Sequence, residues 1–167
     1  MAEKTGSSTR GQLGSLLGYH LRRASTAMMS DLSTELGAAA LRPVQFAILS
    51  LVADNDGISQ TALCRALSVQ KANMVPLIAE LERGGLLARR PADWDRRVQL
   101  LRLTDEAEAR LPAWRKLVAK HEARFFKPLT AAERGEMSRM LRKLWVEEGT
   151  ESPATPETLP PSVARKG

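Results

Sequence analysis

The stretch RGGLLARRPADWDRRVQLLRLT, residues 83–104, decides the fold expected for this chain. Its two glycines, Gly84 and Gly85, would end a preceding helix where the backbone needs a positive φ. Apolar and β-branched residues follow in two short runs, at 86–87 and 98–103, and predict two strands. A helix followed directly by such a hairpin is typical of a DNA-binding wing.

The turn between the two predicted strands is rich in arginine. Pro91 and two aspartates favour a turn, and cationic side chains surround it. An arginine on a protruding hairpin can enter a narrow minor groove, where the negative potential is strongest, and Asp95 could orient it through a bidentate pair. The alternative is a solvated charged hairpin. The cations of this turn are Arg89, Arg90, Arg96 and Arg97.

Size and charge narrow the class of protein. With 167 residues, 43% of them apolar, the chain can bury one sizeable core. A balance of 25 Lys and Arg against 19 Asp and Glu gives a net charge of +6, which suits a polyanionic partner. No apolar run approaches the ~20 residues that span a bilayer, and the N-terminus lacks a hydrophobic leader. We therefore expect a cytoplasmic protein without a membrane partner.

The residue types needed for most catalytic and metal sites are scarce. Cys64 is the only cysteine, which excludes an intramolecular disulfide and fits a reducing compartment. With only His20 and His121 beside it, no set of metal ligands forms. No glycine-rich phosphate loop or Ser-His-Asp set can be assembled either. We expect neither an enzyme nor a bound cofactor.

The two ends of the chain differ from its middle. Residues 1–10 are small and polar and residues 150–167 are rich in proline, so both are expected to be disordered. Over about 11–36, apolar residues recur at three- and four-residue steps and predict a long first helix that needs a partner surface. This stripe consists of Leu13, Leu17, Leu21, Ala24, Met28, Leu32 and Leu36.

Three more helices should precede the hairpin. One begins at Pro43, the next follows the N-cap Ser59, and the last begins near Gln70. With the hairpin they predict a winged helix-turn-helix over about 41–104. The last of them is the recognition helix, whose first polar side chains would reach bases or phosphates from the major groove, unless they are an ordinary polar helix start. The candidates are Ser68, Gln70, Lys71 and Asn73.

Two helices are expected after the hairpin, over about 105–148. Thr104 would cap the first, and Thr130 with Glu133 forms a capping box for the second. Together with the first helix they present more apolar surface than a small winged domain covers, so we expect them to pack on a second subunit. An intramolecular bundle is the alternative. The predicted fold is mainly α with a small β-hairpin wing, flanked by N- and C-terminal dimerisation helices.

The order of these elements, with several motifs, resembles the MarR family of transcriptional regulators. The resemblance covers roughly residues 11–148, and its most specific part includes Asp95-Arg96-Arg97 and Leu103-Thr104. It implies a homodimer with a winged helix-turn-helix in each subunit, bound to a pseudo-palindromic operator in double-stranded DNA. The other matching motifs are Leu41-Arg-Pro-Val-Gln45, Ile58-Ser-Gln-Thr-Ala-Leu63 and Leu81-Glu-Arg-Gly-Gly-Leu-Leu87.

The resemblance also implies roles for single residues. Asp95 and Arg97 match the wing residues that position and insert the minor-groove arginine, and residues 70–73 match the start of the recognition helix. Where the family commonly has Thr-Arg in that helix, this chain has Val75-Pro76. Because an interior proline removes a backbone hydrogen bond, the helix would either begin late or bend there.

A small-molecule effector is a further implication of the resemblance, often an aromatic carboxylate or an acyl-CoA thioester bound between the dimerisation helices and the winged domain. An aromatic ring and a cation near one apolar stripe could hold it; the alternative is a surface histidine beside solvated arginines. Some family members sense oxidants through a cysteine of the first helix, whereas Cys64 falls on the third and is interpreted as a small buried residue. The effector candidates are Tyr19, His20, Arg23 and Met28.

The hypothesis that results is a sequence-specific transcriptional repressor that its effector releases from the operator. Its main alternative is a winged-helix module whose hairpin binds another protein. A DNA-binding dimer would lose affinity steeply as the salt concentration rises, and an interaction module would not.

Overall fold

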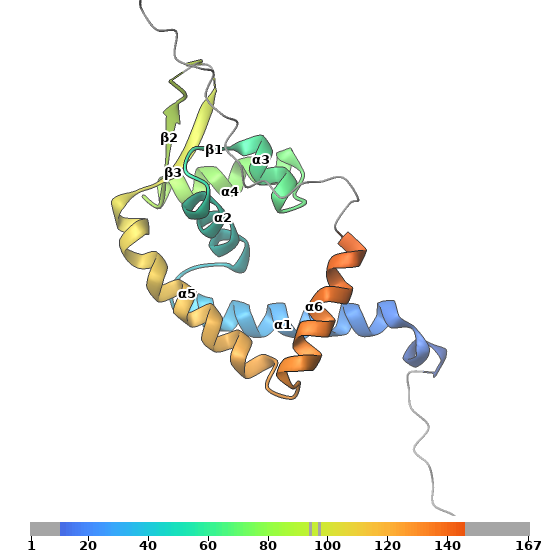
Figure 1. Ribbon diagram of the computed structural model, residues 1–167. Coiled ribbons are helices and arrows are strands. Elements are labelled where there is room, and N and C mark those ends of the chain that lie inside the picture. The colour runs from blue at the N-terminus through green and yellow to red at the C-terminus, as the bar shows by residue number, and fades with distance from the viewer. Residues whose placement is uncertain (1–10, 94, 97, 146–167) are drawn as a thin grey trace, which may run out of the picture. The chain divides into compact units, whose positions relative to one another are not determined.

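The computed structural model describes residues 11–93, 95–96 and 98–145 (Figure 1). They fall into two compact units, divided between Phe125 and Phe126. The first unit holds a 3₁₀ turn, five helices and a three-stranded sheet, and the second holds the last helix. The expectations for residues 1–10 and 150–167 lie outside the described residues.

The elements confirm the predicted fold, mainly α with a small wing. One strand, β1, was not predicted, because two residues are too few to show an alternating pattern. The helices are α1 (Leu17–Gly37), α2 (Pro43–Asp54), α3 (Gln60–Ala66), α4 (Lys71–Arg83), α5 (Asp105–Phe125) and α6 (Ala131–Trp145), and the strands are β1 (Ile58–Ser59), β2 (Leu87–Pro91) and β3 (Gln99–Leu103).

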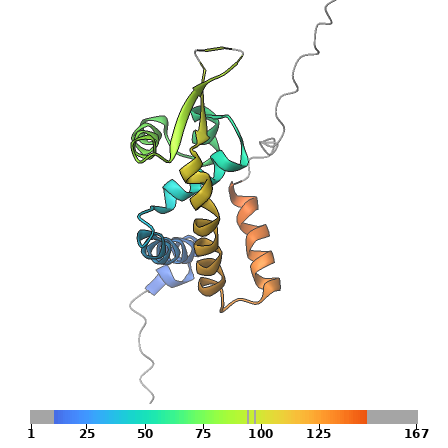
Figure 2. The same cartoon turned by 90° about the vertical axis from the view of Figure 1, so that its left-hand side faces the viewer.

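Strand β3 lies at the centre of the sheet. It pairs antiparallel with β1 and with β2, in a register that sets Leu87 opposite Leu103. Leu87 and Leu101 are buried in the core, at 3% and 0% exposure. Because alternate residues of a strand face opposite sides, Arg90 and Arg102 lie on the outer face. The hairpin of β2 and β3 projects beyond the helices of its unit (Figure 2).

Helix α4 packs one face into the core through Met74, Ile78 and Leu81, whose three- and four-residue spacing places them on one side of the helix. Its C-terminus is a Schellman motif, in which the Leu86 amide donates to the Leu81 carbonyl at 2.9 Å. Gly85 has a φ of +69°, whereas Gly84 has −77°. The prediction of a positive φ is therefore confirmed for Gly85 and wrong for Gly84.

The predicted first helix is in two parts. A 3₁₀ turn, Gly11–Ser15, precedes α1, and the intervening Leu16 is extended, with φ −86° and ψ 121°. Glycines at positions 11, 14 and 18 lower the helix propensity of this segment. Leu36, at the end of the stripe, is buried. Three leucines near its beginning are exposed: Leu13 (53%), Leu17 (78%) and Leu21 (44%).

Helices α1 and α5 pack together around a charged cluster. Arg124 of α5 donates to Asp31 of α1 at 2.8 Å and also pairs with Glu35. The Arg124 guanidinium holds the pKa of Asp31 below its usual range. His121 is only 1% exposed, and its Nε2 lies 3.2 Å from Asp31 Oδ2. These contacts fix where α5 lies against α1.

Both caps predicted after the hairpin are confirmed. The Ala107 amide donates to Thr104 Oγ at 3.2 Å at the start of α5. In the second unit, the Glu133 amide donates to Thr130 Oγ at 3.3 Å, and the Thr130 amide donates to the Glu133 carboxylate at 2.7 Å, which completes the capping box. Backbone hydrogen bonding of this side-chain carboxylate lowers the pKa of Glu133.

Helix α4 begins at Lys71 and continues through Pro76, so a late start is excluded. Pro76 has no amide to donate to the Ala72 carbonyl. We expect Pro76→Ala to raise the free energy of unfolding by about 1–3 kcal/mol, because the restored hydrogen bond outweighs the unfolded-state entropy that proline removes. Urea unfolding followed by circular dichroism measures the change.

Pro43 provides the matched control, because it occupies the first turn of α2, where no helical hydrogen bond is lost. Pro43→Ala should not raise stability. An unchanged or lower stability of Pro76→Ala would contradict the expectation.

Candidate nucleic-acid interface

The N-terminal end of α4 is exposed and free of negative charge. Its N-cap residue, Gln70, makes no side-chain capping bond, and no acidic residue occupies the first turn. Gln70, Lys71 and Asn73 are all exposed. The positive end of the helix dipole and a lysine therefore coincide at a surface that suits phosphates and base edges.

A tight turn holds α4 against α3. Ser59 Oγ accepts the Ala62 amide at 3.2 Å, which confirms Ser59 as the N-cap of α3. Ser68 has a φ of +51° and is exposed between the two helices. The Val69 amide donates to the Cys64 carbonyl at 3.0 Å, and Cys64 is partly buried against the core. The order α3, turn, α4 is that of a helix-turn-helix.

Arg89 links the wing to α4. Its Nε donates to Glu82 Oε1 at 2.8 Å, and both side chains are about two-thirds buried, with exposures of 35% and 28%. The guanidinium is thus paired at the protein surface. The pair can position the wing relative to α4. The predicted contact of Arg89 with DNA stays a prediction.

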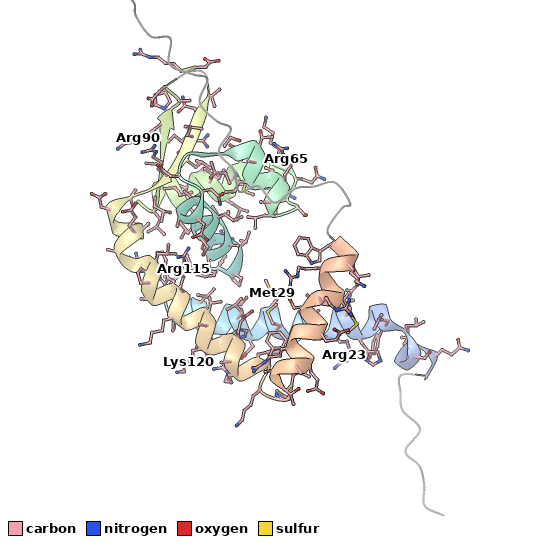
Figure 3. The ribbon with its side chains drawn as sticks, viewed as in Figure 1. Arg23, Met29, Arg65, Arg90, Arg115 and Lys120 are labelled. Carbon is pink, nitrogen blue, oxygen red and sulfur yellow. The ribbon has the colours of Figure 1, made fainter. Side chains whose placement is uncertain are left out.

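The remaining candidates of the wing lie at its turn and outer face. Arg90 is on the outer face of β2 (Figure 3). The turn closes through the Ala92 amide, which donates to the Val98 carbonyl at 2.8 Å. Arg96 and Asp95 are exposed in this turn. Arg97 lies outside the described residues.

Sequence reasoning missed a second ion pair of α4. Arg42, the residue before α2, pairs with Glu80. These residues are 38 positions apart, so no local pattern signals their pairing. Glu80 and Glu82 are the two acidic residues of α4, and each is paired with an arginine. Helix α4 therefore presents little uncompensated negative charge to a polyanion.

Behind the wing, a cavity of about 490 Å³ lies between the end of α2, the outer face of the sheet and the start of α5. Arg102 lines this cavity and pairs with Asp56 at 3.2 Å. The lining combines two arginines with three carboxylates, Asp56, Asp105 and Glu108. This mixed charge gives no strong preference for an anion.

The effector candidates are only partly brought together. The Tyr19 and His20 rings meet edge to face, with centroids 5.6 Å apart, and Arg23 Cζ lies 5.9 Å from the Tyr19 centroid. His20 also hydrogen-bonds to the Gly14 carbonyl at 2.8 Å. Met28 follows Tyr19 by nine residues, about two and a half turns, so it lies on another side of α1.

The described residues contain no group of three or more side chains that could hold a metal ion. None of the described helices is long and apolar enough to cross a membrane.

The fold and this surface define a winged helix-turn-helix protein. The model of the MarR family matches residues 41–98. A putative transcriptional regulatory protein for the hcr operon of Thauera aromatica is 30% identical over 145 residues, 86% of this chain and 87% of that protein. The chain belongs to the MarR family of transcriptional regulators, whose members are DNA-binding proteins and not enzymes.

Two solved structures of the transcriptional repressor CouR are similar to this chain. One is bound to a 23-mer DNA duplex and has 34% sequence identity and a TM-score of 0.78, covering 83% of this chain and 98% of that one. The other is bound to p-coumaroyl-CoA and has 32% identity and a TM-score of 0.75, covering 83% and 97%.

Thr104 joins the turn after α4 to the start of α5. Its Oγ donates to the Gly85 carbonyl at 2.6 Å and accepts the Ala107 amide at 3.2 Å. We expect Thr104→Val to lower the free energy of unfolding by about 1–3 kcal/mol, because both hydrogen bonds are lost while the side-chain shape is kept. Equilibrium unfolding in urea measures the loss.

Thr34→Val is the matched control. The Thr34 hydroxyl is exposed and bonds only back to the Ser30 carbonyl of its own helix, so we expect a change within about 0.5 kcal/mol. Equal effects of the two substitutions would show that Thr104 has no special role.

Proposed function

We propose that this protein is a homodimeric repressor that binds a pseudo-palindromic operator and is released by a small aromatic carboxylate or its CoA thioester. The observation that carries the proposal is the exposed, cationic N-terminus of α4 beside a wing with arginines at its turn. A recognition helix in the major groove and a wing at the adjoining minor groove use these two features together.

Each candidate residue takes a part in this contact. Asn73 reads a base edge, whereas Lys71 neutralises a phosphate. Gln70 and Ser68 lie at the helix start, within reach of either. In the wing turn, Arg96 and Arg97 provide the cations for the minor groove, and Asp95 orients Arg97. The Arg89–Glu82 pair keeps the wing at a fixed place relative to α4.

The exposed apolar surface of α1 supports a homodimer. Leu17, Leu21 and Met29 of α1 are exposed by 78%, 44% and 41%, and Leu13 of the preceding 3₁₀ turn by 53%. Met29 is labelled in Figure 3. In the second unit, α6 exposes Met140, Leu144 and Trp145 by 50%, 70% and 70%. Exposed large apolar side chains in such numbers are typical of an interface, and a two-fold dimer would bury the same face of both subunits.

The cluster of Tyr19, His20 and Arg23 supports an effector with an aromatic ring and an anionic group. Tyr19 offers a ring face or edge for stacking, and Arg23 offers a charge that is not held in a described ion pair. The CouR structure with p-coumaroyl-CoA makes that thioester the first ligand to test. An effector shifts the DNA-binding equilibrium only if it prefers one spacing of the two recognition helices.

The test of operator binding is fluorescence anisotropy on a duplex selected from a random library by the full-length protein. We expect Asn73→Ala to weaken binding to the selected duplex by about 1–3 kcal/mol and to leave binding to a scrambled duplex nearly unchanged. Lys71→Ala should weaken both equally and reduce the slope of log K against log salt by about 1, because one phosphate contact is lost.

Lys120→Ala is the control for lost positive charge, since Lys120 lies on α5, at the end remote from the wing (Figure 3). Its affinity for both duplexes should equal that of the wild type. Equal losses on selected and scrambled DNA for Asn73→Ala would remove its assigned role. Failure to select any sequence would favour a protein partner for the wing.

For the effector, we expect p-coumaroyl-CoA to release the protein from the selected duplex. Arg23→Ala should raise the concentration needed for half release by about tenfold, because a charge-assisted hydrogen bond is worth about 1.5–3 kcal/mol. Arg22→Ala, next to it on α1, controls for the loss of charge. Half release at the same concentration in both variants would place the effector elsewhere.

A further inference from the structure

An apolar strip runs along the outward side of the recognition helix. Its members follow the spacing i, i+3, i+4, i+7, which places them on one side of a helix. The first three are exposed, with Val75 at 46%, and the fourth is partly buried. The apolar strip consists of Ala72, Val75, Pro76 and Ala79.

This strip is not part of the hydrophobic core. Met74, Ile78 and Leu81 form the buried side of α4, at 0%, 0% and 2% exposure, and none of them belongs to the strip. Single exposed apolar residues are ordinary on protein surfaces. Here the two outer members are alanines, so no long side chain of the strip prevents a flat surface from approaching Val75 and Pro76.

The charges around the apolar strip favour DNA as the partner that approaches it. The two carboxylates of α4, Glu80 and Glu82, are paired with Arg42 and Arg89. Lys71 lies at the start of the same helix, whose first turn carries no acid. An apolar strip between a cation and neutralised acids can approach a polyanion without repulsion.

We propose that Val75 and Pro76 read thymine in the operator by contact with its C5-methyl group. This methyl is the apolar feature that base edges present in the major groove, and apolar side chains are its natural partners. Neither Val75 nor the Pro76 ring brings a polar side-chain group that would lose hydration at such a contact. The proposal rests on the proposed function, in which α4 enters the major groove.

Asn73 lies beside the strip, three residues before Pro76 and so on an adjoining side of the helix. An asparagine can bond to N6 and N7 of adenine, and the partner of adenine is thymine. The two contacts together favour a half-site containing adenine and thymine in neighbouring positions. A methyl buried against Val75 contributes about fourfold in affinity.

The test uses the wild-type protein and the duplex it selects from the random library. Each thymine is replaced in turn by deoxyuridine, which removes the C5-methyl group and leaves every hydrogen-bonding group in place. We expect at least one replacement in each half-site to raise the Kd about fourfold. Fluorescence anisotropy at constant salt measures it.

Val75→Ala shows which side chain meets the methyl. For this variant, the duplex with deoxyuridine at the sensitive position should have the same Kd as the duplex with thymine there, because the contact with the methyl group is already lost. Circular dichroism checks its folding, which alanine favours in a helix. Val75→Thr keeps one methyl and the shape of the side chain, so part of the sensitivity should remain. The control variant Lys120→Ala should show the full wild-type increase in Kd on deoxyuridine replacement.

Each outcome separates this proposal from the proposed function. Selective binding that is indifferent to every deoxyuridine would overturn thymine reading and leave the regulator intact. An undiminished deoxyuridine effect in Val75→Ala would remove Val75 from the contact. A library that yields no preferred sequence would overturn both proposals.

Discussion

The register between β2 and β3 is the constraint on which the surface formed by α4 and the wing depends. Leu101 is fully buried, so a slip of one residue would turn Leu100 or Arg102 into the core. The same register decides which side of the hairpin each arginine occupies. Arg89 is placed against α4 and Arg90 on the outer face. Burial of Leu101 in the core thus determines which face of the hairpin each arginine of the wing occupies.

Helix α4 serves the core and the outer surface at once. Its buried side anchors it through Met74 and Ile78, and the Schellman motif at Gly85 turns the chain into β2 without a linker. Its two acidic side chains pair with arginines of the same chain. The exposed side of α4 therefore presents neutral and cationic groups. The arrangement explains how one short helix can be fixed firmly in the protein and still offer most of its first two turns to a partner.

Much of this architecture could be predicted from the sequence, because the signals are local. Two short apolar runs predicted β2 and β3, and Ser59, Thr104 and Thr130 marked three helix starts that the hydrogen bonds confirm. The ion pairs made by Arg42 and Arg89 could not be predicted, since they depend on the packing of distant segments.

The candidate effector site also shows that local sequence patterns predict only local contacts. Tyr19 and Arg23 are four residues apart, so their contact follows from helix geometry, whereas Met28 was grouped with them only because it shared the predicted stripe. The interruption at Leu16 also escaped prediction, because periodicity records which residues are apolar and takes little account of three nearby glycines.

The hydrogen bonds of Thr104 and the ion pair of Arg89 have a consequence for the shape of the DNA that this protein prefers. They link the hairpin to α4. In the proposed complex with DNA, the protein therefore sets the distance between the major groove that α4 would enter and the minor groove that the wing would enter. The duplex must then supply the matching twist between a major groove and its neighbouring minor groove. Base pairs that touch no side chain, but alter that twist, become part of the recognised sequence.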